Sequence, residues 1–407
     1  MRVSSAWQSG IALLEDNVFQ KKLLPEDSPL IEKRKAVRVT VGVPLRFRVK
    51  GKHPTWNEGE SVDVSNTGVR LAVMKFVPVG AHLQLEVWLP QTKRNLQLEG
   101  VVVWTRPSRT AESVFECGVA FRNLREVTKK QKLIYFISDS LCHIATKKPP
   151  KEITCYPAQT FEELKSAYHL IYKEYFQRGY CEPHPSEMHY SVFCILPESR
   201  TFVLKKREGQ MLGTLSLIVD SPLGLPMESV FPKLIQSLRD SGRRLGEVSL
   251  LALDQEAFGK KSFSLMDFQK LTGAFRLFKL AFDYAYSVAG LTDLVITVHP
   301  KHADLYRYLT YEIMAAPRAI PSACGKAGLP MKLDIQKSLA NRHVSKSLRD
   351  YFVHHQSIPR DLLTKCFQWD RESLHEMLVT TRPLWQELPP KFRKHLKNYY
   401  PDFEPGE

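Results

Sequence analysis

Residues 32–70 read EKRKAVRVTVGVPLRFRVKGKHPTWNEGESVDVSNTGVR, and this stretch decides the fold of the N-terminal part of the chain. From Val37 to Val49 apolar residues occupy alternate positions, which is the period of a strand with one buried face. Pro44 lies inside that run and predicts an edge position or a bulge, because proline donates no backbone hydrogen bond. Residues 63–68 (DVSNTG) combine an acid, a hydroxyl and a glycine able to adopt a positive φ, which predicts a tight turn.

The same alternation returns farther along the chain, around residues 69–73, 83–89, 96–104 and 115–121. Turn formers such as Pro78-Val79-Gly80 and Pro90 separate these runs. Short strands at this spacing predict a small antiparallel β-barrel. A helix over about residues 125–143 is expected to close it, since apolar residues recur there among polar ones.

Composition and charge narrow the class of protein. The 407 residues suffice for two or three domains, and 43% hydrophobic with 25% charged residues is ordinary for a globular protein. The net charge of +15 indicates anionic partners, and nucleic acid, a cyclic dinucleotide, an acidic carrier protein and anionic lipid all fit it. Because the chain has no nucleic-acid-binding motif, we do not expect a nucleic-acid partner.

Cysteine usage and hydropathy indicate a cytoplasmic protein. The seven cysteines are scattered without a C-x-x-C pair, so we predict neither a disulfide framework nor a metal site. No signal peptide and no apolar stretch of about 18 residues is found, so no transmembrane segment is expected. Peripheral attachment at the inner membrane stays open.

A charged, proline-rich run at residues 147–151 (KKPPK) cannot continue a helix and predicts a domain boundary. After it, Thr160 and Glu163 have the spacing of a capping box, and helix-like and strand-like runs then alternate. This order predicts an α+β domain with a mixed sheet. We expect the following organisation: a tail over 1–31, the barrel and its closing helix over 32–145, a linker over 146–152, the α+β domain over 153–340 and a helical extension over 341–407.

The first domain resembles the PilZ family of cyclic di-GMP receptors. The residues that carry the resemblance are Arg34 and Arg38, then Asp63, Ser65 and Gly68, and finally the GVAF sequence at 118–121. A basic pair before a strand is commonly a solvated linker, and D-x-S-x-x-G is commonly a plain turn. Both at the expected separation favour a binding site, because guanidinium forks suit phosphate and guanine edges.

The resemblance implies cyclic di-GMP as an allosteric ligand. Arg34 and Arg38 would hold its phosphates and guanine faces, Asp63 and Ser65 would hydrogen-bond guanine and phosphate, and Gly68 would permit close approach of the backbone.

Residues 155–335 resemble the GNAT-type acyltransferase fold, and within it the branch of N-acyl amino acid synthases and acyl-homoserine lactone synthases. The segments that carry this resemblance are 246–253 (GEVSLLAL) and 298–306 (VHPKHADLY). The resemblance implies transfer of a fatty acyl group from a thioester to an amine, such as an amino acid.

The site residues follow from the chemistry of such a transfer. Glu247 would remove the proton of the amine, and the backbone N–H groups of a bulged strand near Leu250 and Leu251 would bind the acyl carbonyl oxygen. Tyr306 would protonate the leaving sulfur. Without the family, a glutamate that opens a strand is more often a surface residue, and a tyrosine on a short helix is more often packing.

Two departures from the family pattern set the alternatives. Leu250 stands where many relatives carry an arginine, so a non-catalytic cyclic di-GMP receptor that contacts a partner protein is the alternative function. The glycine-rich loop that grips coenzyme A is missing from residues 254–263, which favours an acyl-carrier protein over acyl-CoA as the acyl-phosphopantetheine donor. Lys260 and Lys261 could meet this acidic partner or lie on a solvated loop.

Overall fold

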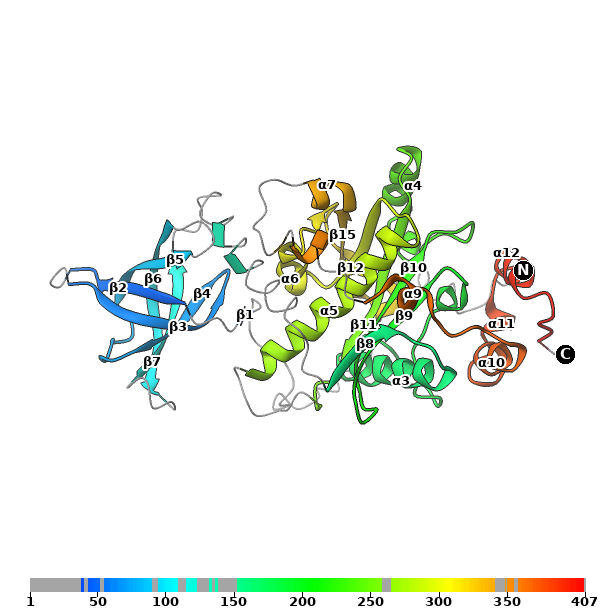
Figure 1. Cartoon of the computed structure of the whole chain (residues 1–407), viewed down its shortest axis with the longest axis horizontal. Coiled ribbons are helices and arrows are strands. Elements are labelled where there is room, and N and C mark those ends of the chain that lie inside the picture. The colour runs from blue at the N-terminus through cyan, green and yellow to red at the C-terminus, as the bar shows by residue number, and fades with distance from the viewer. Residues whose placement is uncertain are drawn as a thin grey trace, which may run out of the picture.

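Two separate β-sheets, formed by consecutive parts of the chain, organise the molecule (Figure 1). The structure is a computed structural model. The residues that it describes are 38–39, 43–51, 55–89, 94–108, 115–122, 132–133, 136–137, 152–257, 265–340, 348, 350–354 and 358–405.

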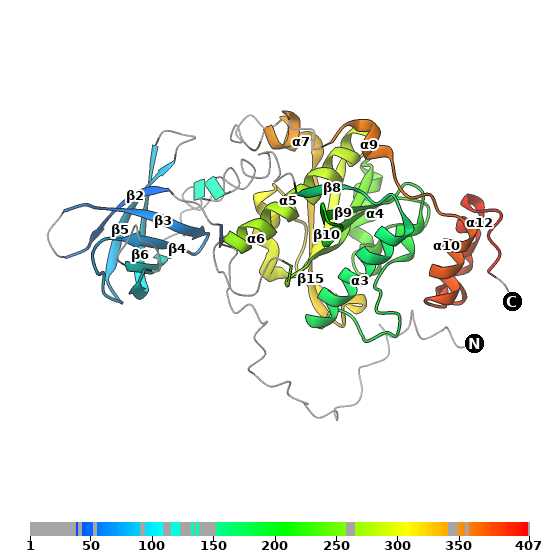
Figure 2. The same ribbon diagram turned by 60° about the horizontal axis from the view of Figure 1, so that its bottom comes forward.

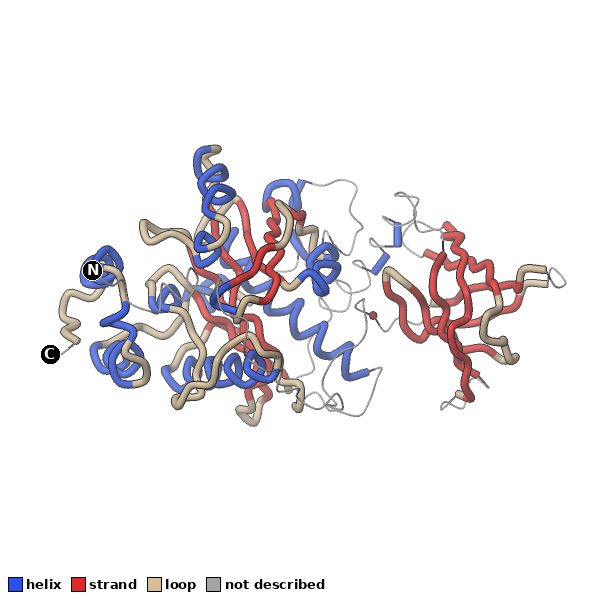
Figure 3. The backbone as a smooth tube through the Cα atoms, turned by 180° about the vertical axis from the view of Figure 1, so that it is seen from behind, coloured by secondary structure: helices blue, strands red, loops and turns tan. Residues whose placement is uncertain are grey.

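Seven strands form the N-terminal sheet: β1 (Arg38–Val39), β2 (Pro44–Val49), β3 (Asn57–Ser65), β4 (Gly68–Val73), β5 (His82–Leu89), β6 (Arg94–Pro107) and β7 (Phe115–Arg122). Six of them, in the order β3-β2-β5-β6-β7-β4, close into an antiparallel barrel because β3 also pairs with β4. Inward residues such as Phe47, Leu71 and Leu85 fill the barrel with apolar side chains. The predicted barrel is confirmed, and the strands drawn in red in Figure 3 show it from behind.

The N-terminal half of the barrel differs from the prediction in one place, at the turn after β3. The described parts of the run from Val37 to Val49 are β1 and β2, and both pair with β3, in registers that differ by one residue. Pro44 is the first residue of β2, a position where a missing N–H costs no ladder bond. Asp63 and Ser65 belong to the end of β3, so the predicted turn shortens to the two residues between β3 and β4.

The closing helix expected over residues 125–143 lies mostly outside the described residues. Leu133, Phe136 and Ile137, which the structure does describe, are helical and buried in the same hydrophobic cluster as the barrel interior.

Eight strands form the second sheet: β8 (Ile153–Pro157), β9 (Arg200–Lys206), β10 (Met211–Val219), β11 (Leu245–Leu253), β12 (Asp293–Val298), β13 (Glu312–Ile313), β14 (Arg318–Ile320) and β15 (Lys326–Asp334). Seven of them follow the order β13-β15-β12-β11-β10-β9-β8, with β14 paired to β15. Neighbouring strands are antiparallel except β11 and β12, which run parallel. This mixed sheet with helices is the predicted α+β arrangement.

The helical segments of the second part are α3 (Phe161–Gln177), η1 (Val192–Ile195), η2 (Pro226–Ser229), α4 (Pro232–Asp240), α5 (Leu265–Ser287), η3 (Pro300–His302), α6 (Ala303–Tyr308), η4 (Pro321–Ala323), α7 (Ile335–Ala340), η5 (Asp350–His354), α9 (Arg360–Thr364), α10 (Arg371–His375), η6 (Glu376–Thr380), α11 (Leu384–Glu387) and α12 (Pro390–Tyr399). Helices α3 and α5 cover opposite faces of the sheet and belong to different buried clusters (Figure 2). No helix among the described residues has the length and apolarity that a bilayer crossing requires.

Helix α3 begins as the sequence predicts, with one difference at its cap. The Thr160 hydroxyl accepts from the Glu163 N–H at 3.2 Å, as an N-cap does. Glu163 reaches back to the N–H of Gln159 rather than to that of Thr160, and it also accepts from Lys205. Strand and helix are therefore joined at this corner by charge as well as by the cap.

The C-terminal extension packs on both faces of the second sheet. Tyr351 and Phe352 of η5 belong to the cluster on the α5 face, whereas Met377 of η6 and Phe392 of α12 belong to the cluster on the α3 face. The helices expected in this extension are confirmed, and Figure 1 shows α10, α11 and α12 side by side at one end of the molecule.

Candidate active site

The two halves of the predicted nucleotide site meet at the pairing of β1 with β3. Arg38 is opposite Ser65, and Val39 is opposite Val64, in an antiparallel register. Arg34 lies outside the described residues. The backbone therefore brings the second arginine of the basic motif next to the serine of D-x-S-x-x-G, although 27 residues separate them in the sequence.

Asp63 is held inside the protein by an ion pair with Arg70. The Arg70 Nε and the Asp63 carboxylate are 2.7 Å apart, and both side chains are nine-tenths buried. The other edge of Arg70 faces Glu116 at 3.6 Å, and Glu116 also binds Arg106 at 2.7 Å. Asp63 therefore has a structural partner in the protein itself, in addition to the role toward a guanine base that the family resemblance implies.

Ser65 and Gly68 shape the turn between β3 and β4. The fully buried Ser65 hydroxyl accepts from the Gly68 N–H at 3.2 Å and from the Thr67 N–H at 3.3 Å. Gly68 does not adopt a positive φ, contrary to our expectation. A Cβ atom there would clash with the carbonyl oxygen of Val119, so glycine is required for the close approach of β4 to β7.

Glu247 is buried in the middle of the second sheet. It lies opposite Ile218 on β10 and Val295 on β12, and only 4% of its surface is exposed. One carboxylate oxygen accepts a hydrogen bond of 2.8 Å from the N–H of Met227 in η2. The pKa of Glu247 is raised to about 8: burial is the main cause, the Met227 N–H lowers the pKa, and the nearby charge of Glu228 raises it. A carboxyl group with this pKa can exchange a proton near neutral pH.

A second ion-pair group supports the segment that contacts Glu247. Glu228 accepts from the Leu225 N–H at 2.6 Å and binds both terminal nitrogens of Arg239. Arg239 also binds Asp220 at 2.7 Å. These contacts fix the position of η2, and with it the Met227 N–H that Glu247 uses.

Strand β11 carries a bulge at Leu250 and Leu251. Thr214 pairs with Ala252 and Ser216 with Ser249, so two residues of β11 face one residue of β10. Leu250 has a φ of 53°, a left-handed conformation that is uncommon for a leucine. The bulge reverses the side-chain alternation, because Leu245 before it and Ala252 after it both lie in the α3-side cluster, although an uninterrupted strand would place them on opposite faces.

Just before the bulge, β11 loses its parallel partner. The register between β11 and β12 ends at Glu247 and Val295, after which β12 continues alongside β15. The backbone of residues 248–253 is therefore paired with β10 on one side, and within the described residues no strand pairing joins its other side to β12. This is the place where the predicted acyl-binding N–H groups lie.

Tyr306 is on α6, which follows β12 through η3. Its side chain is buried and packs edge-on against Phe278 at 5.5 Å and Tyr311 at 6.0 Å. Burial raises the pKa of Tyr306, and the nearby phenols of Tyr175 and Tyr180 add to this effect. The phenol is therefore neutral at physiological pH, as a proton donor must be.

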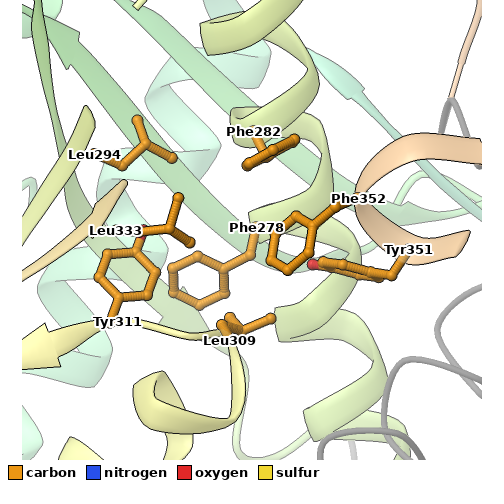
Figure 4. Close-up of a pocket in the computed structure, with 8 residues that line it drawn as sticks. All are labelled: Phe278, Phe282, Leu294, Leu309, Tyr311, Leu333, Tyr351 and Phe352. Carbon is orange, nitrogen blue, oxygen red and sulfur yellow. The ribbon is translucent and has the colours of Figure 1, made fainter. Parts of the chain in front are cut away.

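A pocket lies on the other face of the sheet from Glu247 (Figure 4). Side chains of α5, β12, β15 and η5, together with two residues that follow α6, line it: Phe278, Phe282, Leu294, Leu309, Tyr311, Leu333, Tyr351 and Phe352. Figure 4 shows the Phe278 and Phe352 rings pointing into it. Phe278 and Phe282 of α5 line the pocket, so it is on the α5 side of the sheet, and its lining includes no carboxylate.

Some residues of these sites could not be found from sequence patterns. Arg70, Met227 and Arg239 contact Asp63, Glu247 and Glu228 through strand pairing or loop packing. One feature of the sequence could have indicated Arg70. It is two residues after Gly68, so a hairpin between the two strands would place it opposite a residue of the preceding strand. Lys260 and Lys261 lie outside the described residues. No cluster of His, Cys, Asp or Glu that could hold a metal is present in the described ranges.

Comparison with known protein families divides the chain in two. Residues 32–139 match the PilZ domain family, and residues 166–334 match the family of the N-acyl amino acid synthase FeeM. The resemblances to both families are thereby confirmed. A search of curated proteins found no match.

Solved structures resemble one or the other part of the chain. FeeM, an N-acyl amino acid synthase from uncultured soil microbes, is 23% identical over 46% of this chain and 91% of its own, with a TM-score of 0.40. The PilZ domain of YcgR from Escherichia coli with c-di-GMP is 13% identical over 29% of this chain and 100% of its own, with a TM-score of 0.24. A mutant spermidine N-acetyltransferase SpeG from Vibrio cholerae is 15% identical over 47% of this chain and 99% of its own, with a TM-score of 0.31.

Proposed function

We propose that the chain is a cyclic di-GMP-controlled N-acyltransferase. Its barrel domain (residues 32–145) binds the dinucleotide, and its second domain (residues 153–340) transfers a fatty acyl group from an acyl-carrier protein or acyl-CoA thioester to an amine, such as an amino acid. The two are joined by the linker at 146–152, and the reaction takes place in the cytoplasm. The observation that carries the enzymatic half is the buried Glu247, with its pKa near 8, beside the bulge where β11 leaves β12.

In the proposed reaction the acceptor reacts as a neutral amine. Its nitrogen attacks the thioester carbon, and the carbonyl oxygen becomes an oxyanion. Ionised Glu247 takes the extra proton of the nitrogen, directly or through one water molecule, as the C–N bond forms. The N–H groups of Leu250 and Leu251 at the bulge are the donors proposed for that oxyanion.

The C–S bond breaks as the oxyanion collapses to the amide. The departing thiolate takes the phenolic proton of Tyr306, whose raised pKa makes it neutral before this step. The proton on Glu247 returns to solvent or to the Tyr306 phenolate, so that charge balances over one cycle. The products are an N-acyl amine and the free thiol of the phosphopantetheine carrier.

The barrel half of the proposal is supported by the position of the dinucleotide motif. The register of Arg38 opposite Ser65 places the basic segment beside the turn that ends β3. In this arrangement Arg34 and Arg38 bind phosphates and guanine faces, and Asp63, Ser65 and Gly68 form the opposite wall. A cyclic dinucleotide bound between the basic segment and the turn after β3 would contact both, and would so link the start of the domain to the barrel.

The first experiment measures binding and turnover on the same preparation. Calorimetric titration with cyclic di-GMP should show saturable binding to the wild type and a loss of at least about tenfold in affinity for Arg38→Ala. Thioester consumption with acyl-carrier protein and a panel of amino acids should depend on the presence of the dinucleotide. Saturable binding without any effect on turnover would refute control of the enzyme while leaving the receptor intact.

A non-catalytic receptor is the second candidate, and one observation favours it. Leu250, which stands at the position of an arginine in many relatives, is apolar, and its side chain is buried in the cluster on the α3 face. On this alternative, the second domain contacts a partner protein. Tight binding of cyclic di-GMP together with no turnover on any acyl carrier or acyl-CoA would select it.

A further inference from the structure

The most exposed large apolar side chains of the described residues gather at one place on the barrel. Met74 (63% exposed), Phe76 (60%) and Val79 (62%) lie on the connection between β4 and β5, and Val103 (52%) lies beside it on β6. We name residues 74–81 the apolar loop. Soluble proteins rarely expose several such side chains together unless the surface binds something.

The apolar loop is firmly attached to the barrel. Val77 points inward and is buried, and its carbonyl accepts a 2.5 Å hydrogen bond from the Thr105 hydroxyl. The Gly80 N–H donates to Val102 at 2.8 Å. The Phe76 ring lies edge-on to Phe115 at 5.6 Å. The loop therefore presents its apolar side chains in a preformed arrangement, and their exposure does not come from a loose segment.

The charge of the apolar loop indicates which kind of apolar partner it can bind. Lys75 lies between Met74 and Phe76, is exposed, and is the one charged residue in the sequence of the apolar loop. A lysine among apolar side chains can keep its ammonium group at a bilayer surface while its neighbours enter the interfacial region. The chain as a whole carries a net charge of +15, which favours an anionic surface.

The apolar loop is remote from the nucleotide motif. It begins after Val73, the last residue of β4, whereas the D-x-S-x-x-G turn ends at Gly68, the first residue of that strand. At about 3.3 Å per residue, the two ends of β4 are roughly 16 Å apart. Occupation of the loop would therefore leave the proposed dinucleotide site accessible.

We propose that the apolar loop is a membrane-docking element, which inserts Met74, Phe76 and Val79 into the headgroup region of an anionic bilayer. A second copy of the chain is the less suitable occupant. A symmetric contact would bring one Lys75 toward the other with no acidic residue in the loop to pair with it. Four side chains also offer much less surface than the roughly 800 Å² per partner of a stable interface. The proposal does not depend on the acyl-transfer activity.

Vesicle flotation of the full-length chain tests this proposal. Wild-type protein should float with vesicles of phosphatidylglycerol and phosphatidylethanolamine and much less with phosphatidylcholine alone. The double variant Met74→Ser/Phe76→Ser should lose about tenfold or more of the bound fraction. Lys75→Gln should lose about fivefold on the anionic vesicles and little on the neutral ones.

Trp88→Ser is the matched control, because Trp88 is also exposed but lies at the other end of β5 from the apolar loop. This variant should bind like the wild type, and circular dichroism should show all variants folded. Equal flotation of the wild type and the double variant would overturn the proposal, as would no flotation of the wild type. A concentration-dependent dimer that the double variant abolishes, without vesicle binding, would assign the loop to a second copy instead.

Discussion

The two candidate sites use their polar residues in opposite ways. In the barrel, Asp63 is paired with Arg70, and the Ser65 hydroxyl bonds the turn that contains Gly68, so the motif residues also hold the fold together. In the second sheet, Glu247 forms no ion pair with a cationic side chain of the described residues and accepts a hydrogen bond from one backbone N–H, while burial keeps its pKa near 8.

The difference indicates which carboxylates stabilise the fold and which are available for proton transfer. A buried carboxylate in an ion pair is satisfied before any ligand arrives, so its removal costs stability. A buried carboxylate without such a pair is held at a cost to the fold and is ready to take part in proton transfer. We therefore expect substitutions in the barrel motif to affect folding and binding together, and substitution of Glu247 to lower turnover while removing a pH-dependent cost to stability.

The largest effect is expected for Glu247→Gln. Loss of a general base typically lowers the rate by about 10²–10⁴-fold, and glutamine preserves the shape and can still accept the Met227 N–H. Thioester consumption with a saturating amine measures the rate, and thermal unfolding checks the fold. Turnover within about threefold of the wild type would remove Glu247 from the mechanism.

Asp63→Ala should destabilise the barrel by about 3 kcal/mol, because it leaves the buried Arg70 guanidinium without its nearest carboxylate. Denaturant unfolding measures this change. Glu60→Ala is the control, since Glu60 is on the same strand and exposed. If Asp63→Ala unfolds like the control, the ion pair is not a structural element of the barrel and the contrast between the two sites fails.

The stability of the fold should decrease as the pH rises, because Glu247 loses its proton. The ordinary pKa of a glutamate is 4.5, and that of Glu247 in the fold is about 8, so the folded state holds the proton more tightly. Between these pH values the free energy of unfolding should decrease by up to about 1.4 kcal/mol per pH unit from this group, and the loss is complete above pH 8. Comparing the wild type with Glu247→Gln isolates the contribution, and parallel curves would contradict the raised pKa.

The ion-pair group on η2 should tune the pH dependence of turnover. Activity is expected to rise with pH around the pKa of Glu247, because the base must be ionised. Glu228→Gln removes a negative charge and should lower the midpoint, whereas Arg239→Gln leaves that charge uncompensated and should raise it, each by about one pH unit. Shifts in the same direction would mean that both substitutions act only by moving η2.

The smallest effect is expected for Tyr306→Phe. Phenylalanine keeps the ring contacts with Phe278 and Tyr311 and removes only the proton donor. We expect a fall of about tenfold or less in kcat with an unchanged KM, because water can also protonate a thiolate. A donor with a better leaving thiol should reduce the difference, and the same loss with every donor would indicate a packing role.

Sequence patterns predict the strands in which apolar and polar residues alternate and the apolar residues form one buried face. Strands β4, β5 and β7 are found within a residue or two of their expected places, because their inward residues alternate without interruption. The long strand β15 was not predicted, since Gly328 and Pro330 interrupt its pattern. Gly328 lies so close to Ile320 and Thr297 that no Cβ fits, which only the assembled sheet reveals.

The candidate site was predictable only through family resemblance. Nothing local to Glu247 indicates that η2 supplies an N–H to it, because Met227 is brought there by a loop 20 residues earlier. The bulge at Leu250 is likewise invisible in an apolar run such as SLLAL, where either side chain could face either cluster.

The brief parallel pairing of β11 with β12 also bears on how the second domain can move. Three consecutive residues, Leu245 to Glu247, register with three on β12, and nearby Arg243 bridges Asp293 and Asp334 at the same end. Within the described residues, the two halves of the sheet are thus joined by strand pairing at these three positions alone, and Glu247 is the last of them. A change in the angle between β11 and β12 would therefore be centred next to Glu247.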